Sequence, residues 1–179
     1  MEKKYGKQWV EEGLAQKRAD PKLNSLLTDD EYLAIRGYTG SSYREINGAL
    51  RSGNPGEWAA LAHEASSGMK KLADNGYNAN DPLFRDANFT PDQIKDLFPD
   101  SGVFTDKRFV STTTVPGGVF PGNTKIVVVE NQSGVSVSRI SIIPSEAEIL
   151  FKPNTSFDII SVARDPTTGK NIIVLRERP

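Results

Sequence analysis

The sequence contains no cysteine among its 179 residues. This absence excludes disulfide bonds, thiolate-bound metals and a cysteine nucleophile, and it leaves the redox compartment open. The one histidine, His63, is followed by Glu64 but not by a second histidine four residues further on. The motif of a zinc protease is therefore missing, and we expect His63 to face solvent.

Charge is nearly balanced, with 22 Lys and Arg against 23 Asp and Glu and a net charge of -1. No basic excess points to nucleic acid, although such a balance is compatible with a local basic patch. The first residues are polar and precede no long apolar run, so we expect no signal peptide and no membrane span. No Gly-x-Gly-x-x-Gly follows a strand-like segment, so any dinucleotide would not be held in the Rossmann manner.

Residues 7 to 75 have the spacing of helices. Two capping boxes, Thr28 with Glu31 and Ser42 with Glu45, predict two helix starts. A third helix follows, and its apolar residues recur at helical spacing. Its predicted buried stripe consists of Trp58, Leu61, Ala62, Ala65, Met69 and Leu72.

Residues 83 to 179 read mainly as strands. A short helix is expected at Thr90, where Pro91 and Gln93 complete a helix-start pattern. Helices followed by strands predict an α+β fold in a single domain over residues 1–179. Strands are predicted at 109–113, 125–129, 135–138, 148–151, 156–163 and 171–175.

Two carboxylates, Glu146 and Glu148, stand at the start of one of these strands. Side chains alternate faces along a strand, so we expect both carboxylates on one face and Ala147, Ile149 and Phe151 on the other. Carboxylates this close repel each other unless a positive charge lies between them, such as an oxocarbenium or a guanidinium. The alternative is an edge strand with a solvated acidic face.

Four groups of residues follow one another along the chain. They are Tyr38-Thr39-Gly40 with Tyr43, Ile46-Asn47 and Leu50-Arg51; Leu83-Phe84-Arg85; Phe109-Val110-Ser111-Thr112-Thr113; and Glu146-Ala147-Glu148. Each group alone is weakly specific, but the four in this order are strongly specific. Together they resemble the Arg-Ser-Glu class of mono-ADP-ribosyltransferases, and specifically the bacterial exoenzyme toxins with a Glu-x-Glu motif.

The resemblance implies amino-terminal helices followed by a mostly antiparallel core of two β-sheets that encloses an NAD cleft. It implies NAD as the donor substrate, no metal, and cleavage of the nicotinamide–ribose bond through an oxocarbenium-like state. Glu148 would stabilise that state, because preorganised charge is usually the largest catalytic contribution. Ser111 would hydrogen-bond Glu148 and fix its rotamer.

Arg85 and Arg36 compete for the catalytic arginine of the family. We choose Arg85, which follows an apolar-aromatic pair at a strand start, and interpret Arg36 as a solvated helix residue. Arg85 would clamp an NAD phosphate or ribose through its forked donors. A salt bridge with Asp81 or Asp86 is the alternative for Arg85.

The remaining predicted NAD contacts are Tyr38, Asn47 and Phe120. In the family the first two reach NAD from amino-terminal helices, whereas core packing and a helix-surface amide are their structural alternatives. Phe120 lies at the tip of a loop rich in proline and glycine. It would stack on nicotinamide or bury itself for structural reasons.

Glu146 would hold and deprotonate the acceptor, and the resemblance implies arginine as that acceptor. Residues 138–144 would form the target-recognition loop. Family members often carry an aromatic residue there, whereas this chain has Ile142 and Ile143. RNA therefore stays open as an acceptor beside protein arginine.

The resemblance thus implies the catalytic domain of a toxin or effector that ADP-ribosylates a macromolecule of a target cell. We expect export without a signal peptide as part of a larger protein, action in the target-cell cytoplasm, no membrane partner and an immunity protein in the producer. An NAD glycohydrolase and a catalytically inactive binding module are the rival functions.

Overall fold

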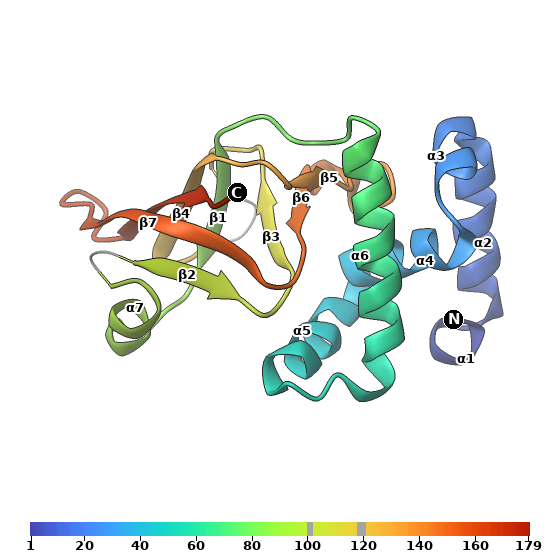
Figure 1. Ribbon diagram of the computed structural model, residues 1–179, viewed down its shortest axis with the longest axis horizontal. Helices are drawn as coiled ribbons and strands as arrows, with labels where there is room; N and C mark the ends of the chain where they lie inside the picture. The colour runs from blue at the N-terminus through green and yellow to red at the C-terminus, as the bar shows by residue number, and fades with distance from the viewer. Residues whose placement is uncertain (100–101, 118–120) are drawn as a thin grey trace. The chain divides into compact units, whose positions relative to one another are not determined.

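The structure is a computed structural model, and it describes residues 1–99, 102–117 and 121–179 (Figure 1). The chain divides into two compact units. We call Met1–Tyr77 with Val137–Ser145 the helical unit, and Asn78–Ser136 with Glu146–Pro179 the β unit. Helices come first and strands follow, so the predicted α+β class is confirmed.

The helical unit is formed by the helices predicted from residues 7 to 75 and by one short helix before them. The capping box of Thr28 and Glu31 is confirmed, because each side chain accepts a backbone N–H of the other residue. Most of the predicted stripe of the last helix is buried, whereas Trp58 is half-buried. The elements are α1 (Glu2–Tyr5), α2 (Lys7–Ala19), α3 (Pro21–Leu26), α4 (Asp29–Gly37), the kinked segment η1 (Tyr38–Ser42), α5 (Tyr43–Ser52), the 3₁₀-helix η2 (Gly56–Trp58) and α6 (Ala59–Asp74).

The predicted capping box at Ser42 is wrong. The backbone stays helical past Gly37 and kinks only at Gly40, where φ is -96° and ψ is -120°, and Ser42 itself has helical dihedrals of φ -82° and ψ -4°. A cap residue needs an extended backbone to turn its side chain onto the free N–H groups. The Ser42 side chain makes no such bond within the described part of the chain, and its Oγ accepts a hydrogen bond from Tyr5 Oη at 2.8 Å.

Arg36 is buried, with 8% of its surface exposed, so the prediction of a solvated side chain is wrong. Its Nη1 donates to Gln16 Oε1 at 2.7 Å, and its guanidinium lies 5.7 Å from the centre of the Trp9 ring. Gly13 explains why α2 and α4 approach so closely here. A Cβ at Gly13 would lie 3.2 Å from Arg36 Cδ.

The segment Val137–Ser145 belongs to the helical unit, although residues 135–138 were predicted as one strand. The strand ends at Ser136. Beyond it, the Ile140 carbonyl accepts from Arg36 Nη1 at 3.5 Å, and Ile142 N donates to Thr39 Oγ1 at 3.3 Å. Backbone groups after Ser136 thus find partners on helices, which ends the strand early.

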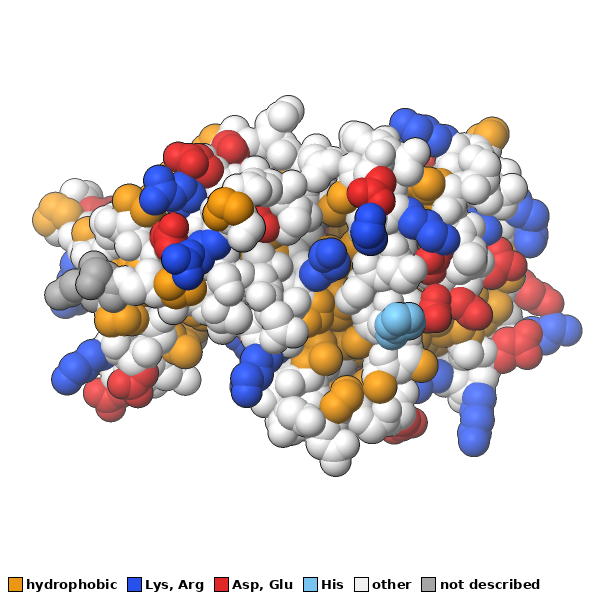
Figure 2. Space-filling view, viewed as in Figure 1, with side chains coloured by type: hydrophobic (Ala, Val, Ile, Leu, Met, Phe, Trp, Pro, Cys, Tyr) orange, Lys and Arg blue, Asp and Glu red, His pale blue; other side chains and the backbone are white. Residues whose placement is uncertain are grey.

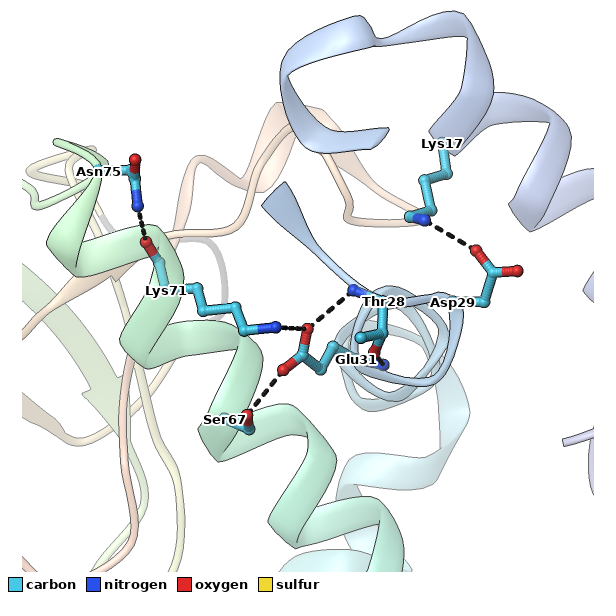
Figure 3. Close-up of polar contacts among 7 residues, drawn as sticks. All are labelled: Lys17, Thr28, Asp29, Glu31, Ser67, Lys71 and Asn75. Carbon is cyan, nitrogen blue, oxygen red and sulfur yellow. Dashed lines mark hydrogen bonds and ion pairs between the residues drawn. The ribbon is translucent and has the colours of Figure 1, made fainter. Parts of the chain in front are cut away.

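Glu31 links α4 to α6 inside the helical unit (Figure 3). The side chain is buried, and its Oε2 accepts from Thr28 N and Lys71 Nζ, both at 2.8 Å, while Oε1 accepts from Ser67 Oγ at 2.7 Å. Burial alone would raise the pKa of Glu31, but these hydrogen bonds and the Lys71 charge outweigh it and lower the pKa. The ionised carboxylate is therefore the form that the fold stabilises.

The β unit is built on one sheet with the strand order β2-β7-β8-β4-β1-β3-β6-β5. The predicted strands are present with shifted ends, β2 is additional, and the helix at Thr90 begins with the predicted capping box. The elements are β1 (Leu83–Ala87), α7 (Pro91–Leu97), β2 (Val103–Asp106), β3 (Val110–Thr113), β4 (Thr124–Glu130), β5 (Val135–Ser136), β6 (Glu148–Phe151), β7 (Thr155–Arg164) and β8 (Asn171–Glu177), with the 3₁₀-helix η3 (Pro144–Glu146) at the boundary of the two units.

All strand pairs are antiparallel except β4 with β8, as far as the structure describes the chain. Two sheets were expected, whereas the structure has one hydrogen-bonded sheet of eight strands. The pairing of β1 with β3, which joins its two parts, is short. Strand β1 pairs with β4 along five residues, whereas it pairs with β3 only at Phe84 and Thr113. The two parts of the sheet enclose an apolar core of Leu83, Phe98, Phe104, Val110, Ile126, Val128, Ile149, Phe151, Phe157, Ile159, Ile173 and Leu175.

We predict that Glu31→Gln lowers the free energy of unfolding by about 1–3 kcal/mol at neutral pH, because charge-assisted hydrogen bonds are lost. Since the folded pKa is lowered, the advantage of the wild type is complete above the unfolded value of about 4.3. It disappears as the pH falls through the folded pKa. Urea unfolding between pH 3 and 7 measures both effects.

Glu11→Gln is the matched control for this prediction. Glu11 pairs with Lys7 at 3.5 Å on an exposed face of α2, and exposed pairs contribute about 0–1 kcal/mol. An equal loss of stability in the two variants would contradict the role given to Glu31.

Candidate active site

Glu148 is the first residue of β6 and the centre of the candidate site. It is Cα partner to Thr113 of β3, and its side chain is buried. The Ser111 hydroxyl donates to Glu148 Oε1 at 2.7 Å. Glu148 Oε2 is buried and has no hydrogen-bond partner among the described residues. The carboxylate is thus fixed through one oxygen, and the other oxygen can accept a bond from a ligand.

Burial is the main cause that raises the pKa of Glu148 above its usual range. The neighbouring charge of Glu146 acts in the same direction, while the Ser111 hydrogen bond and the Arg85 charge lower the pKa. A buried carboxyl group whose neighbours shift its pKa in opposite directions is typical of functional sites.

Glu146 does not lie on the strand, so the expected alternation of Glu146 and Glu148 along one strand is wrong. Glu146 ends η3, and Ala147 has a left-handed φ of 47° before β6 begins. The Thr113 hydroxyl donates to the Glu146 carbonyl at 2.8 Å and so attaches this turn to β3. The two carboxylates are nevertheless close enough for Glu146 to raise the pKa of Glu148.

Arg85 extends from β1 towards the strand that carries Ser111. Its Nη1 donates to the Ser111 carbonyl at 2.9 Å, and its charge lowers the pKa of Glu148. Of the two acidic residues weighed as alternative partners, Asp86 forms an ion pair with Lys170 at 3.6 Å and Asp81 accepts from Asn131. The structure therefore brings Arg85, Ser111, Glu146 and Glu148 together in the β unit.

Tyr38 and Asn47 belong to the helical unit, where they contact each other. Asn47 Nδ2 donates to Tyr38 Oη at 2.9 Å, and Tyr38 is buried. Their predicted contact with NAD stays a prediction. Phe120, the third predicted NAD contact, lies outside the described residues.

The segment predicted to recognise the acceptor presents two apolar side chains. Ile142 is 41% exposed and Ile143 is 47% exposed. A Cβ on Gly40 would lie 2.6 Å from Ile142 Cδ1, so Ile142 lies against a residue of η1 that has no side chain. Apolar groups exposed in a loop favour an interaction role over a packing role.

His63 is exposed, as predicted. In the described ranges, no group of three or more His, Asp or Glu side chains is placed to hold a metal ion. No described helix is both long enough and apolar enough to cross a membrane.

A family model described as NAD:arginine ADP-ribosyltransferase matches residues 1–179. The chain belongs to this family. It is 32% identical over 177 residues to the NAD(+)--protein-arginine ADP-ribosyltransferase Tre1 of Serratia proteamaculans, a match that covers 97% of this chain and 38% of Tre1. A protein of Mycobacterium avium named as a putative NAD(+)--arginine ADP-ribosyltransferase is 31% identical, over 85% of this chain and 18% of its own length. The chain thus spans less than two fifths of these relatives.

Among solved structures, the chain is similar to exoenzyme S of Pseudomonas aeruginosa, crystallised with human 14-3-3 protein beta and bound to carba-NAD. The TM-score is 0.78 at 25% identity, and the match covers 98% of this chain and 84% of exoenzyme S. The chain has the α+β fold of ADP-ribosyltransferases, and NAD is the donor substrate of its family.

The residues of the β unit suit an NAD substrate. A ribose hydroxyl needs an acceptor, and Glu148 Oε2 is a buried acceptor without a partner among the described residues. A diphosphate needs a cation with several donors, and Arg85 is a guanidinium whose charge reaches Glu148. The site therefore provides an acceptor, Glu148, for the nicotinamide ribose and a cation, Arg85, for the diphosphate.

Thr113 has a part in the site that was not predicted from the sequence. Its hydroxyl holds the turn that bears Glu146. The available signal was its position two residues after Ser111, which places both side chains on one face of β3.

We predict opposite pKa changes for Glu148 in two variants. Ser111→Ala removes a hydrogen bond that favours the charged form, so the pKa of Glu148 rises further. Glu146→Gln removes a neighbouring negative charge, so the pKa falls. Carboxyl-carbon NMR titration of Glu148 measures both shifts, and shifts of the same sign would contradict this account of the site.

Proposed function

We propose that this chain transfers the ADP-ribose of NAD to arginine side chains of target proteins, with residues 1–179 acting as one catalytic domain. The observation that carries the proposal is the state of Glu148. Its carboxylate is buried, one oxygen is held by Ser111, and the other has no partner in the described part of the protein. Such a group is arranged for charge that develops in a bound substrate.

Glu148 and Ser111 would act on the donor. The ionised Glu148 accepts a hydroxyl of the nicotinamide ribose through Oε2 and stabilises positive charge as the bond to nicotinamide breaks. Nicotinamide leaves with the electron pair of that bond. Ser111 holds the carboxylate in one rotamer, so little reorganisation is needed in the transition state.

Arg85 would hold the diphosphate of NAD through its forked donors. This interaction places the anomeric carbon near Glu148 and converts binding energy into orientation. Tyr38 and Asn47 would add contacts to NAD, as the family resemblance implies.

Glu146 would serve the acceptor. A carboxylate can bind a guanidinium through two parallel hydrogen bonds, and it can take the proton that the attacking nitrogen loses. The bond between that nitrogen and the anomeric carbon replaces the bond to nicotinamide. Ile142 and Ile143, both exposed, would contact apolar groups of the target protein.

RNA is the alternative acceptor, and we favour protein. Figure 2 shows Lys and Arg side chains interspersed with Asp and Glu on the face in view, where a nucleic-acid site would favour a basic field.

Water in the place of the acceptor would give an NAD glycohydrolase with the same residues. A binding module without activity would leave the arrangement at Glu148 without a purpose.

We further infer that the chain acts as part of a longer toxin or effector inside target cells. The support is indirect: its relatives include longer proteins, and exoenzyme S was crystallised with a human protein. A producing cell would then need an immunity protein against its own toxin.

We predict that wild-type protein, given labelled NAD and a cell lysate, labels protein, and that Glu148→Gln labels it at least about 100-fold more slowly. The exposed Glu130→Gln is the matched control and should act like the wild type. Label in RNA would change the acceptor, and nicotinamide release without label would indicate the glycohydrolase. Absence of both, with folded protein, would contradict the proposal and favour the binding module.

A further inference from the structure

Tyr5, the last residue of α1, lies against the point where α4 passes into η1. Its Oη donates to Ser42 Oγ at 2.8 Å, and its ring stacks on Trp9 with centroids 4.3 Å apart. A Cβ on Gly37 would lie 2.5 Å from Tyr5 Oη, so only glycine allows the ring to approach this closely. Tyr5 thus contacts the end of α4 and the end of η1.

Lys4, the neighbour of Tyr5 in α1, makes a second contact, because its Nζ lies 3.0 Å from the centroid of the Trp58 ring. We call the contacts of Tyr5 and Lys4 the clamp. Trp58 follows α5 in the chain, whereas Ser42 precedes it. Two neighbouring residues of α1 therefore contact the segments on either side of α5. A four-residue helix has too little hydrogen bonding to persist alone, so these contacts define its role.

The segment η1 is a kink between α4 and α5, because Gly40 within it has non-helical dihedrals of φ -96° and ψ -120°. Ser42 stands where a capping residue is predicted, yet its hydroxyl accepts from Tyr5.

The segment η1 carries Tyr38 as its first residue, and α5 carries Asn47. Asn47 Nδ2 donates to Tyr38 Oη at 2.9 Å. The position of this pair depends on how η1 joins α4 to α5, since Tyr38 is fixed by η1 and Asn47 by α5. Tyr5 lies against Gly37 at the end of α4 and contacts Ser42 at the end of η1, one residue on either side of the kink.

Tyr5 can act as a donor throughout the neutral range. Burial raises the pKa of Tyr5 above its usual value, and the Glu45 charge adds to this effect against the opposing Ser42 hydrogen bond. The hydroxyl therefore keeps its proton.

We propose that Tyr5 is a positioning residue, which holds η1 through Ser42 so that Tyr38 and Asn47 are arranged for NAD before NAD binds. The proposal rests on the proposed function, in which these two residues contact NAD. Ordering a binding group in advance removes an entropic cost from binding, so loss of the clamp weakens NAD binding and leaves the chemical step unchanged.

The test is the steady-state rate of nicotinamide release by wild type, Tyr5→Phe, Ser42→Ala and the double variant. Tyr5→Phe keeps the ring on Trp9 and removes only the hydroxyl. We expect KM for NAD to rise about five- to tenfold in each single variant, the equivalent of one hydrogen bond, with kcat nearly unchanged. The double variant should be no weaker than the weaker single variant, because both remove one interaction.

Tyr77→Phe is the matched control, because the buried Tyr77 hydroxyl has no partner among the described residues. Its KM should equal that of the wild type. An unchanged KM in Tyr5→Phe, or a lower thermal midpoint without a change in KM, would overturn the positioning role. A wild-type protein that releases no nicotinamide would overturn the proposed function itself, and the role of Tyr5 with it.

Discussion

The hydrogen bond from Ser111 Oγ to Glu148 Oε1 joins the two strands on which the candidate site is built. It depends on the register of β3 with β6, which places Thr113 opposite Glu148. Because Ser111 satisfies one oxygen only, Glu148 keeps a buried Oε2 without a partner in the described structure. A buried charge of this kind destabilises the protein unless a ligand donates a hydrogen bond to it. The packing of the core around β6 must therefore offset this loss of stability.

The neighbours of Glu148 follow from the same register. Arg85 lies on β1, which meets β3 at one residue pair only, and its side chain donates to the Ser111 carbonyl. Thr113 attaches the turn of Glu146 to the same strand. Each catalytic role proposed for this chain thus depends on β3.

Features that depend on neighbouring residues were predictable from the sequence. The helix starts at Thr28 and Thr90 are examples, because a capping box lies within four residues. Features decided by distant residues were not. The Ser42 hydroxyl accepts a hydrogen bond from Tyr5, 37 residues away, and Arg36 is buried by α2 because Gly13 has no side chain. The turn at Ala147 broke the expected alternation, and the grouping of Arg85, Ser111 and Glu148 was expected from family resemblance, not from local spacing.

The central claim is that Glu148 Oε2 is kept for the nicotinamide ribose. A crystal structure of the chain with carba-NAD, a stable analogue of the donor, tests it most directly. The account predicts a hydroxyl of that ribose within about 2.6–3.2 Å of Glu148 Oε2, with the diphosphate at Arg85. An analogue bound elsewhere, with Glu148 Oε2 accepting a bond from a protein group, would contradict the account.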